Sequence, residues 1–117
     1  MQQDNIKNFA IAAFRFYGHR KQQTSLSEND FTVLFAVSLT LKHLEVDGDQ
    51  VALAGIRLVY FGLPSGRLKS NVMTNSVRRA AAQMHSSEGT VWNKLRRARI
   101  LFDKYYKLLL KEKAATE

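Results

Sequence analysis

The residues best suited to chemistry lie in the segment 87–99, where side chains able to hydrogen-bond nucleotide bases are spaced along a predicted helix. Asn93 can pair with adenine, Arg96 with guanine or a phosphate, and Glu88 can accept a hydrogen bond from cytosine. Trp92 fits two interpretations equally: contact with thymine methyls or the sugar backbone, and packing against the preceding loop. Six residues are therefore candidates for contact with base edges in the major groove: Ser87, Glu88, Gly89, Trp92, Asn93 and Arg96.

Basic and hydroxyl side chains around this segment are suited to phosphate contacts, which position a protein on DNA without reading its sequence. The candidates are Arg67, Lys69, Arg78, Arg79, Thr90, Lys94, Arg97 and Arg99. For any one basic residue among them, a solvated charged surface is the alternative interpretation. Their concentration around one predicted helix favours phosphate binding for the group.

The order of small, polar and apolar residues before this helix is typical of a helix-turn-helix. Ala81 is small enough for two helices to cross closely, and Met84 can meet Val91 and Leu95 behind a short turn at residues 85–87. In such a unit the second helix presents its first residues to the bases. The alternative is two ordinary helices joined by a polar turn.

The run Ser87-Glu88-Gly89-Thr90-Val91, with Leu95 and the trailing Arg96-Arg97-Ala98-Arg99, resembles the helix-turn-helix of sigma factor region four and of LuxR-type response regulators. The resemblance covers roughly residues 76–100. At the turn, His85 stands where the family usually has glycine, and Ser86 stands where it usually has an apolar residue.

The wider layout resembles small PapB-type fimbrial-operon regulators and TrfB/KorA-type plasmid repressors. It consists of the start Leu26-Ser27-Glu28-Asn29-Asp30-Phe31, two apolar helices and a C-terminal helix-turn-helix. This resemblance spans roughly residues 26–102. It implies an all-helical bacterial homodimer or oligomer that binds repeated or palindromic operator sites near its own promoter.

The net charge of +8 is unevenly distributed along the chain. Residues 1–63, the neutral half, carry six basic and six acidic residues, whereas residues 64–113, the basic half, carry twelve basic and three acidic ones. This division predicts a neutral region for folding or dimerisation and a cationic region for a polyanion. Nucleic acid is favoured over a membrane surface, because the basic helix lacks a clean apolar face opposite one polar face.

Other chemistries find little support in the composition. The chain has no cysteine, and its histidines, at positions 19, 43 and 85, lack ligand spacing, so no metal site or cofactor is expected. No nucleophile–base pair or pair of acids indicates an enzyme. Without a signal pattern or an apolar run of spanning length, the expected location is the cytoplasm, associated with the nucleoid.

In the neutral half, helical spacing of apolar residues predicts a first helix over 5–20. Ser27 followed by acidic residues predicts the start of a second helix, although residues 31–41 also alternate as a strand would. Residues 47–49 form a turn, and residues 50–63 are apolar enough to be buried in a core or a dimer interface. Residues 56–61 are alternatively a short strand.

In the basic half, a loop over 64–71 leads to a helix from about Met73 to Met84, with Asn71 or Thr74 as its cap. The last helix is expected from Ser87 to about Lys111. Its apolar residues repeat every seven positions and form a seam: Val91, Leu95, Ala98, Phe102, Tyr105 and Leu109. This helix is longer than DNA recognition requires, so its C-terminal part must pack on other helices or on a second subunit.

The sequence therefore predicts an all-α helical bundle with a C-terminal helix-turn-helix and a long last helix. Residues 1–63 form a core or dimerisation region, and residues 64–117 form a basic DNA-binding region. The expected dimer contacts are Val51, Ile56, Val59, Phe61, Phe102, Tyr105 and Leu109. The expected function is a sequence-specific transcription regulator, a repressor or autoregulator, acting as a homodimer or oligomer. The alternative is a non-specific architectural DNA- or RNA-binding protein; no small-molecule ligand is indicated.

Overall fold

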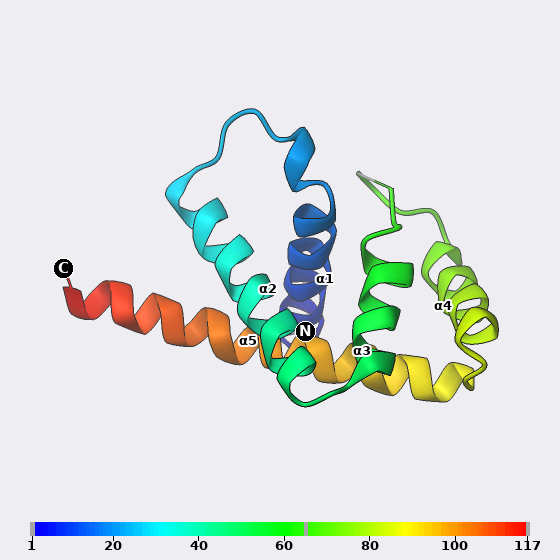
Figure 1. Ribbon diagram of the computed structural model, residues 1–117. Helices are drawn as coiled ribbons and strands as arrows, with labels where there is room; N and C mark the ends of the chain where they lie inside the picture. Colours follow the sequence, from blue (N-terminus) through cyan, green and yellow to red (C-terminus); the bar gives the residue numbers. More distant parts are fainter. Residues whose placement is uncertain (1, 65, 117) are drawn as a thin grey trace.

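The computed structural model describes residues 2–64 and 66–116, with side chains from residue 8 onward (Figure 1). Its helices are α1 (Gln2–Gly18), α2 (Glu28–Val46), α3 (Gln50–Gly55), α4 (Val72–Met84) and α5 (Glu88–Thr116). A 3₁₀ turn, η1 (Arg20–Gln22), follows α1, and a π-helical segment, η2 (Ile56–Tyr60), continues α3. The described ranges contain no strand, so the predicted all-α fold is confirmed.

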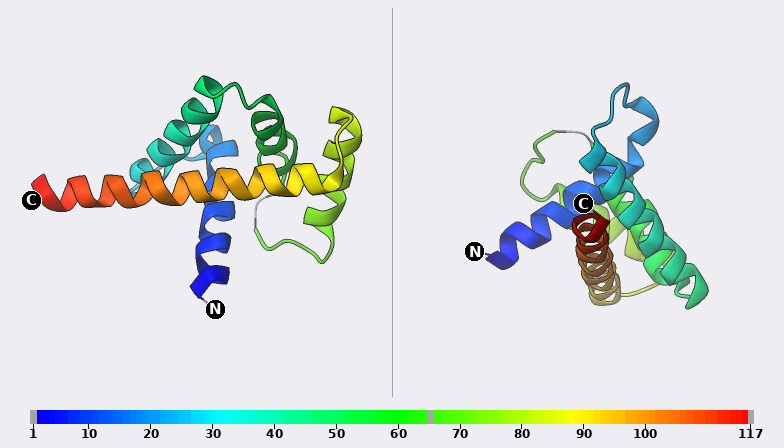
Figure 2. Two further views of the ribbon diagram at one scale, coloured as in Figure 1. Left: turned by 90° about the horizontal axis from the view of Figure 1, so that it is seen from below. Right: turned by 90° about the vertical axis from the view of Figure 1, so that its left-hand side faces the viewer.

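Helix α5 is the axis on which the rest of the chain is assembled. The other helices lie mostly on one side of it in Figure 1, and when seen from below it passes in front of them while its C-terminal end projects beyond the bundle (Figure 2, left). Its 29 residues give a length of about 43 Å at about 1.5 Å per residue. The longest extent of the molecule is 47 Å. Helix α5 therefore spans nearly the full length of the molecule.

The covered side of α5 is the predicted apolar seam. Val91, Leu95, Ala98 and Phe102 are buried, whereas Tyr105 and Leu109 further along are only partly buried. The seam is confirmed as a core element over its first three turns. The helix itself is longer than predicted and ends at Thr116 rather than near Lys111.

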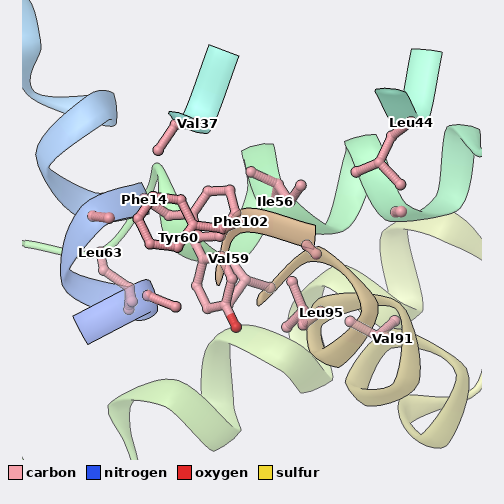
Figure 3. Close-up of a cluster of buried hydrophobic side chains, with 14 of the residues drawn as sticks. Phe14, Val37, Leu44, Ile56, Val59, Tyr60, Leu63, Val91, Leu95 and Phe102 are labelled. Carbon is pink, nitrogen blue, oxygen red and sulfur yellow. The ribbon is translucent and has the colours of Figure 1, made fainter. Parts of the chain in front are cut away.

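Aromatic rings from three parts of the chain meet over this seam (Figure 3). The ring centroid of Phe14 lies 5.2 Å from that of Tyr60 and 5.8 Å from that of Phe102. Ile56 and Val59 complete this buried cluster. The core thus draws on both the neutral and the basic half of the chain.

Burial in this core changes the interpretation of three predicted dimer contacts. Ile56, Val59 and Phe102 are at most 1% exposed within the single chain. Their apolar surface is buried within the single chain, so it is not available for contact with a second chain.

Helix α2 begins with a capping box. The Ser27 hydroxyl accepts a hydrogen bond from the Asp30 amide at 3.1 Å, and the Asp30 carboxylate accepts one from the Ser27 amide at 2.8 Å. The strand alternative for residues 31–41 is wrong, since this cap satisfies donors that only a helix start leaves open. The buried face runs through Val33, Ala36, Val37, Thr40 and Leu44. The largest side chains of the first turns, Phe31 and Phe35, lie outside it.

The strand alternative for residues 56–61 is also wrong. The chain widens there into a π-helical turn, closed by a hydrogen bond from the Phe61 amide to the Ile56 carbonyl at 3.0 Å. The extra residue keeps Ile56, Val59 and Tyr60 all on the buried side. Gly18 contributes to this packing, because a Cβ on it would lie 3.0 Å from the Phe61 Cα.

The turn between α4 and α5 changes the direction of the chain within a few residues (Figure 1). His85 adopts a left-handed conformation with φ of 55°, and hydrogen bonds from the His85 and Ser86 amides reach the Ala82 and Ala81 carbonyls at 3.3 and 2.9 Å. This is the Schellman pattern, in which glycine is the usual residue. Histidine is tolerated there at the cost of backbone strain.

We expect His85→Gly to raise the free energy of unfolding by about 0.5–1 kcal/mol, since glycine adopts positive φ without a Cβ penalty. Chemical denaturation measures this change. Gln83→Gly, two residues earlier inside α4, is the control and is expected to destabilise by about 1 kcal/mol. If His85→Gly destabilises the fold as Gln83→Gly does, the conclusion that the backbone of His85 is strained is wrong.

Candidate nucleic-acid interface

The start of α5 presents three predicted base-contacting residues along one exposed line. Gly89, Asn93 and Arg96 are spaced by four and three residues, so they share one side of the helix, and all three are exposed. The line lies opposite the buried Val91 and Leu95. We call Gly89, Asn93 and Arg96 the reading line.

Nothing in the fold requires glycine at position 89. A Cβ built there would have only the Ser87 hydroxyl within 4 Å, at 4.0 Å, an ordinary contact. Glycine inside a helix costs about 0.5–1 kcal/mol relative to alanine. Its lack of a side chain leaves the backbone of the first turn open to close approach by a ligand.

The other residues of the first turn are engaged in local contacts. The Ser87 hydroxyl caps α5, accepting from the Thr90 amide at 3.0 Å and lying 2.8 Å from the Thr90 hydroxyl. The Glu88 carboxylate accepts a hydrogen bond from Arg78 Nε of α4 at 3.1 Å. This exposed ion pair joins the two helices across the turn, so Ser87 and Glu88 organise the site rather than standing free in it.

Trp92 is only partly buried and packs against the hydrophobic core. It follows Val91 directly and therefore lies beside the reading line rather than on it. The packing interpretation thus accounts for part of its ring.

Two acidic residues of the turn between α2 and α3 hold α5 in place. Asp49 accepts hydrogen bonds from Lys94 Nζ at 3.0 Å and from Arg97, and Asp47 accepts one from the other terminal nitrogen of Arg97 at 2.5 Å. Asp49 also caps α3 by accepting from the Ala52 amide at 3.1 Å. Lys94 and Arg97, both predicted to bind phosphate, are therefore ion-paired within the fold.

The environment of Asp49 favours its charged form. Burial by itself raises the pKa of the Asp49 carboxyl, but hydrogen bonds from Lys94, from the Ala52 amide and from Arg97 outweigh it, and the pKa lies below 3.8. The same carboxylates raise the pKa of Arg97. The lowered pKa means that ionised Asp49 stabilises the folded chain.

Arg99 is likewise directed into the fold. Its Nη1 donates a hydrogen bond to the Tyr60 hydroxyl at 2.9 Å. Burial raises the pKa of Tyr60, and Arg99 partly offsets that rise. The arginine thus satisfies a buried hydroxyl in addition to any contact it makes outside the chain.

The predicted phosphate-binding residues Arg67 and Lys69 are exposed on the segment between η2 and α4. That segment is tied to α1, where Arg15 donates to the carbonyls of Pro64 and Gly66, and His19 Nε2 lies 2.9 Å from the Leu63 carbonyl. Sequence reasoning missed Arg15 and His19 as anchors, because their partners are more than 40 residues away. Arg79 is exposed on α4 near Ser76.

The four remaining predicted dimer contacts occupy four different environments. Val51 is partly buried, Phe61 stacks on Tyr17 with ring centroids 5.5 Å apart, and the Tyr105 hydroxyl lies 2.7 Å from His43 Nδ1. Leu109 instead lines an open groove between α2 and α5, together with the exposed rings of Phe31 and Phe35.

Within the described ranges, no group of three or more His, Cys, Asp or Glu side chains is arranged to hold a metal ion. None of the helices described is long and apolar enough to cross a membrane. Comparisons with protein-family models, curated proteins and solved structures found no match to the chain.

We expect Asp49→Ala to lower the free energy of unfolding by about 2–3 kcal/mol, through loss of a helix cap and of hydrogen bonds to charged groups. Asp49→Asn keeps the cap acceptor and should cost less. Denaturant unfolding at neutral pH measures both changes. Asp103→Asn, which breaks the more exposed pair with Lys107, is the control and should change stability by less than about 0.5 kcal/mol.

The pH dependence of the same variants follows from the lowered pKa. The stability that ionised Asp49 contributes is present above the unfolded-state pKa near 3.8 and is lost as the pH falls through the lower folded-state pKa. The difference in the free energy of unfolding between wild type and Asp49→Asn should therefore decrease only in acid. A difference that stays constant down to pH 2 would contradict the proposed hydrogen-bond network around ionised Asp49.

Proposed function

We propose that the protein is a sequence-specific DNA-binding transcription regulator that acts as a homodimer or oligomer. The feature that supports this most is the exposed reading line at the start of α5, directly after a tight turn from α4. Asn93 and Arg96 are side chains that discriminate adenine and guanine in the major groove. Gly89 leaves room for the helix start to approach the groove floor.

Two further features favour a helix-turn-helix mode of binding. The Arg78–Glu88 pair and the capping by Ser87 fix the relative orientation of α4 and α5. Arg79 is exposed on α4, where the first helix of such a unit crosses the phosphate backbone.

The proposed self-association is supported by the groove between α2 and α5. Phe31 and Phe35 are 60% and 55% exposed beside Leu109. The rim carries Glu28 and Lys113 in an ion pair of 3.0 Å. A surface that presents both signs of charge around an apolar centre can complement itself across a two-fold axis. We therefore assign a second copy of the chain to this groove, with Phe31 and Phe35 added to Leu109 among the contacts.

Selection of bound fragments from a random duplex pool tests the function directly. A regulator should recover one motif, repeated or with dyad symmetry, and bind it roughly a thousand-fold or more tightly than random DNA at fixed salt. Equal affinity for all duplexes would instead support the architectural DNA- or RNA-binding alternative.

Substitutions should separate base readers from phosphate binders. Asn93→Ala and Arg96→Ala are each expected to cost about 1–3 kcal/mol on the selected site and to relax preference at one base pair. Arg79→Ala should weaken binding to all duplexes alike and lower the salt slope by about one unit. Titrations on the selected and single-mismatch duplexes over a range of salt measure both effects.

Arg57→Ala is the matched control, because Arg57 is an exposed arginine of the neutral half. It should change neither the affinity nor the salt slope. If Asn93 and Arg96 substitutions leave sequence preference unchanged while Arg79→Ala alters it, the assignment of reading and positioning helices is wrong.

The groove makes a separate prediction about assembly. Phe35→Ser should raise the dimer dissociation constant at least about tenfold, since two buried phenylalanine side chains are lost from a symmetric interface. Sedimentation at micromolar concentration measures it. Val46→Ser removes a residue that is 74% exposed at the other end of α2 and should leave assembly unchanged. A clean monomer mass for the wild type would refute dimerisation.

A further inference from the structure

The exposed side of α5 continues far beyond the reading line. Ile100, Lys104, Lys107 and Lys111 follow Arg96 at steps of four, four, three and four, and all are exposed. From Asn93 to Lys111 this stripe measures about 27 Å at about 1.5 Å per residue. Figure 2 (left) shows no other helix in front of α5, whose C-terminal part projects beyond the bundle, in agreement with the exposure of these residues.

Charge on the stripe has one sign. Arg96, Lys104, Lys107 and Lys111 lie on it, whereas the nearest acidic side chain, Asp103, stands to one side and pairs with Lys107 at 2.9 Å. The chain thus displays one straight basic rod whose opposite side is the hydrophobic core. Such a surface complements a linear polyanion better than it complements a globular acidic partner.

The residue types change along the stripe where DNA geometry would require it. The major groove is about 12 Å wide, which about eight helical residues cross. The segment 89–96 has that length and carries the groups suited to base edges. Beyond it a straight helix passes over the phosphate strand, where lysine serves as a point charge for phosphate without selecting a base.

We infer that Lys104, Lys107 and Lys111, the lysine segment, bind the phosphates of the same DNA duplex beside the site that the reading line contacts. This inference rests on the proposed function and extends its DNA interface along most of α5. The lysine segment supplies affinity and salt dependence, while sequence preference stays with Asn93 and Arg96. The α2–α5 groove lies on the other side of α5, so a second copy there would leave the lysine segment accessible.

The test compares the triple variant Lys104→Gln, Lys107→Gln, Lys111→Gln with the wild type on a selected duplex of about 25 base pairs. Each phosphate contact contributes about 0.9 to the salt slope on B-DNA. The slope should therefore fall by about two to three units, and affinity near 0.1 M salt should fall roughly a hundred-fold. Base preference should be unchanged.

A second triple variant, Lys21→Gln, Lys42→Gln and Arg57→Gln, removes the same charge from exposed positions of the neutral half and serves as the control. Its slope and affinity should stay close to the wild type. A duplex trimmed to about ten base pairs around the reading line provides an internal comparison. On it the lysine variant and the wild type should bind alike.

Several outcomes would overturn the inference. If both triple variants lose the same DNA affinity and salt slope, the effect arises from net charge and not from the position of the lysine segment. If the salt slope of the lysine variant is unchanged while Asn93→Ala and Arg96→Ala still impair binding, the inference is wrong. That result would exclude the lysine segment from the DNA interface and leave the proposed function intact. If the lysine variant binds DNA as the wild type does but no longer binds anionic phospholipid vesicles, the lysine segment belongs to a membrane-binding surface instead. A wild type that binds no duplex would refute both proposals.

Discussion

The arrangement of the molecule depends on the burial of one stripe of α5. Val91, Leu95, Ala98 and Phe102 lie on a single side of a straight helix, and every apolar contact they make draws other helices to that side. A helix buried along one stripe must expose the opposite one. The reading line and the lysine segment are exposed for this reason, and their alignment over about 27 Å follows from the rigidity of continuous helical backbone.

Local polar contacts determine how the helices are placed along that axis. Asp49 caps α3 and holds Lys94 and Arg97, so one carboxylate both starts a helix and sets its position on α5. Glu88 and Arg78 act similarly between α4 and α5. These contacts lie on either side of the reading line and leave it uncovered. The proposed interface is thus supported by ion pairs that turn adjacent positive charges inward or neutralise them.

Patterns that depend on neighbouring residues could be predicted from the sequence. The seven-residue repeat predicted the α5 seam, and the serine–acid start of α2 predicted a helix against the strand alternation that follows it. The π-helical turn at Ile56–Tyr60 could not be predicted, because an extra residue per turn is stabilised by tertiary packing. The same is true of Phe31 and Phe35. Their spacing suits a helix, but only the packing of Val33 and Val37 determines that the phenylalanines lie outside.

The predicted phosphate contacts illustrate the limit of charge as a sequence signal. Lys94, Arg97 and Arg99 are as basic as Arg96, yet their partners lie 39 to 50 residues away in the chain. Position on the helix separates them, since Lys94 and Arg97 share the side of α5 that meets Asp47 and Asp49, whereas Arg96 lies on the reading line. The net charge of the basic half therefore overstates what a polyanion would meet at the start of α5, because Asp47 and Asp49 of the neutral half neutralise part of it. Along α5, the outward-facing part of this charge lies on Arg96 and the lysine segment, where Lys107 is paired with Asp103, on the side that the core leaves exposed.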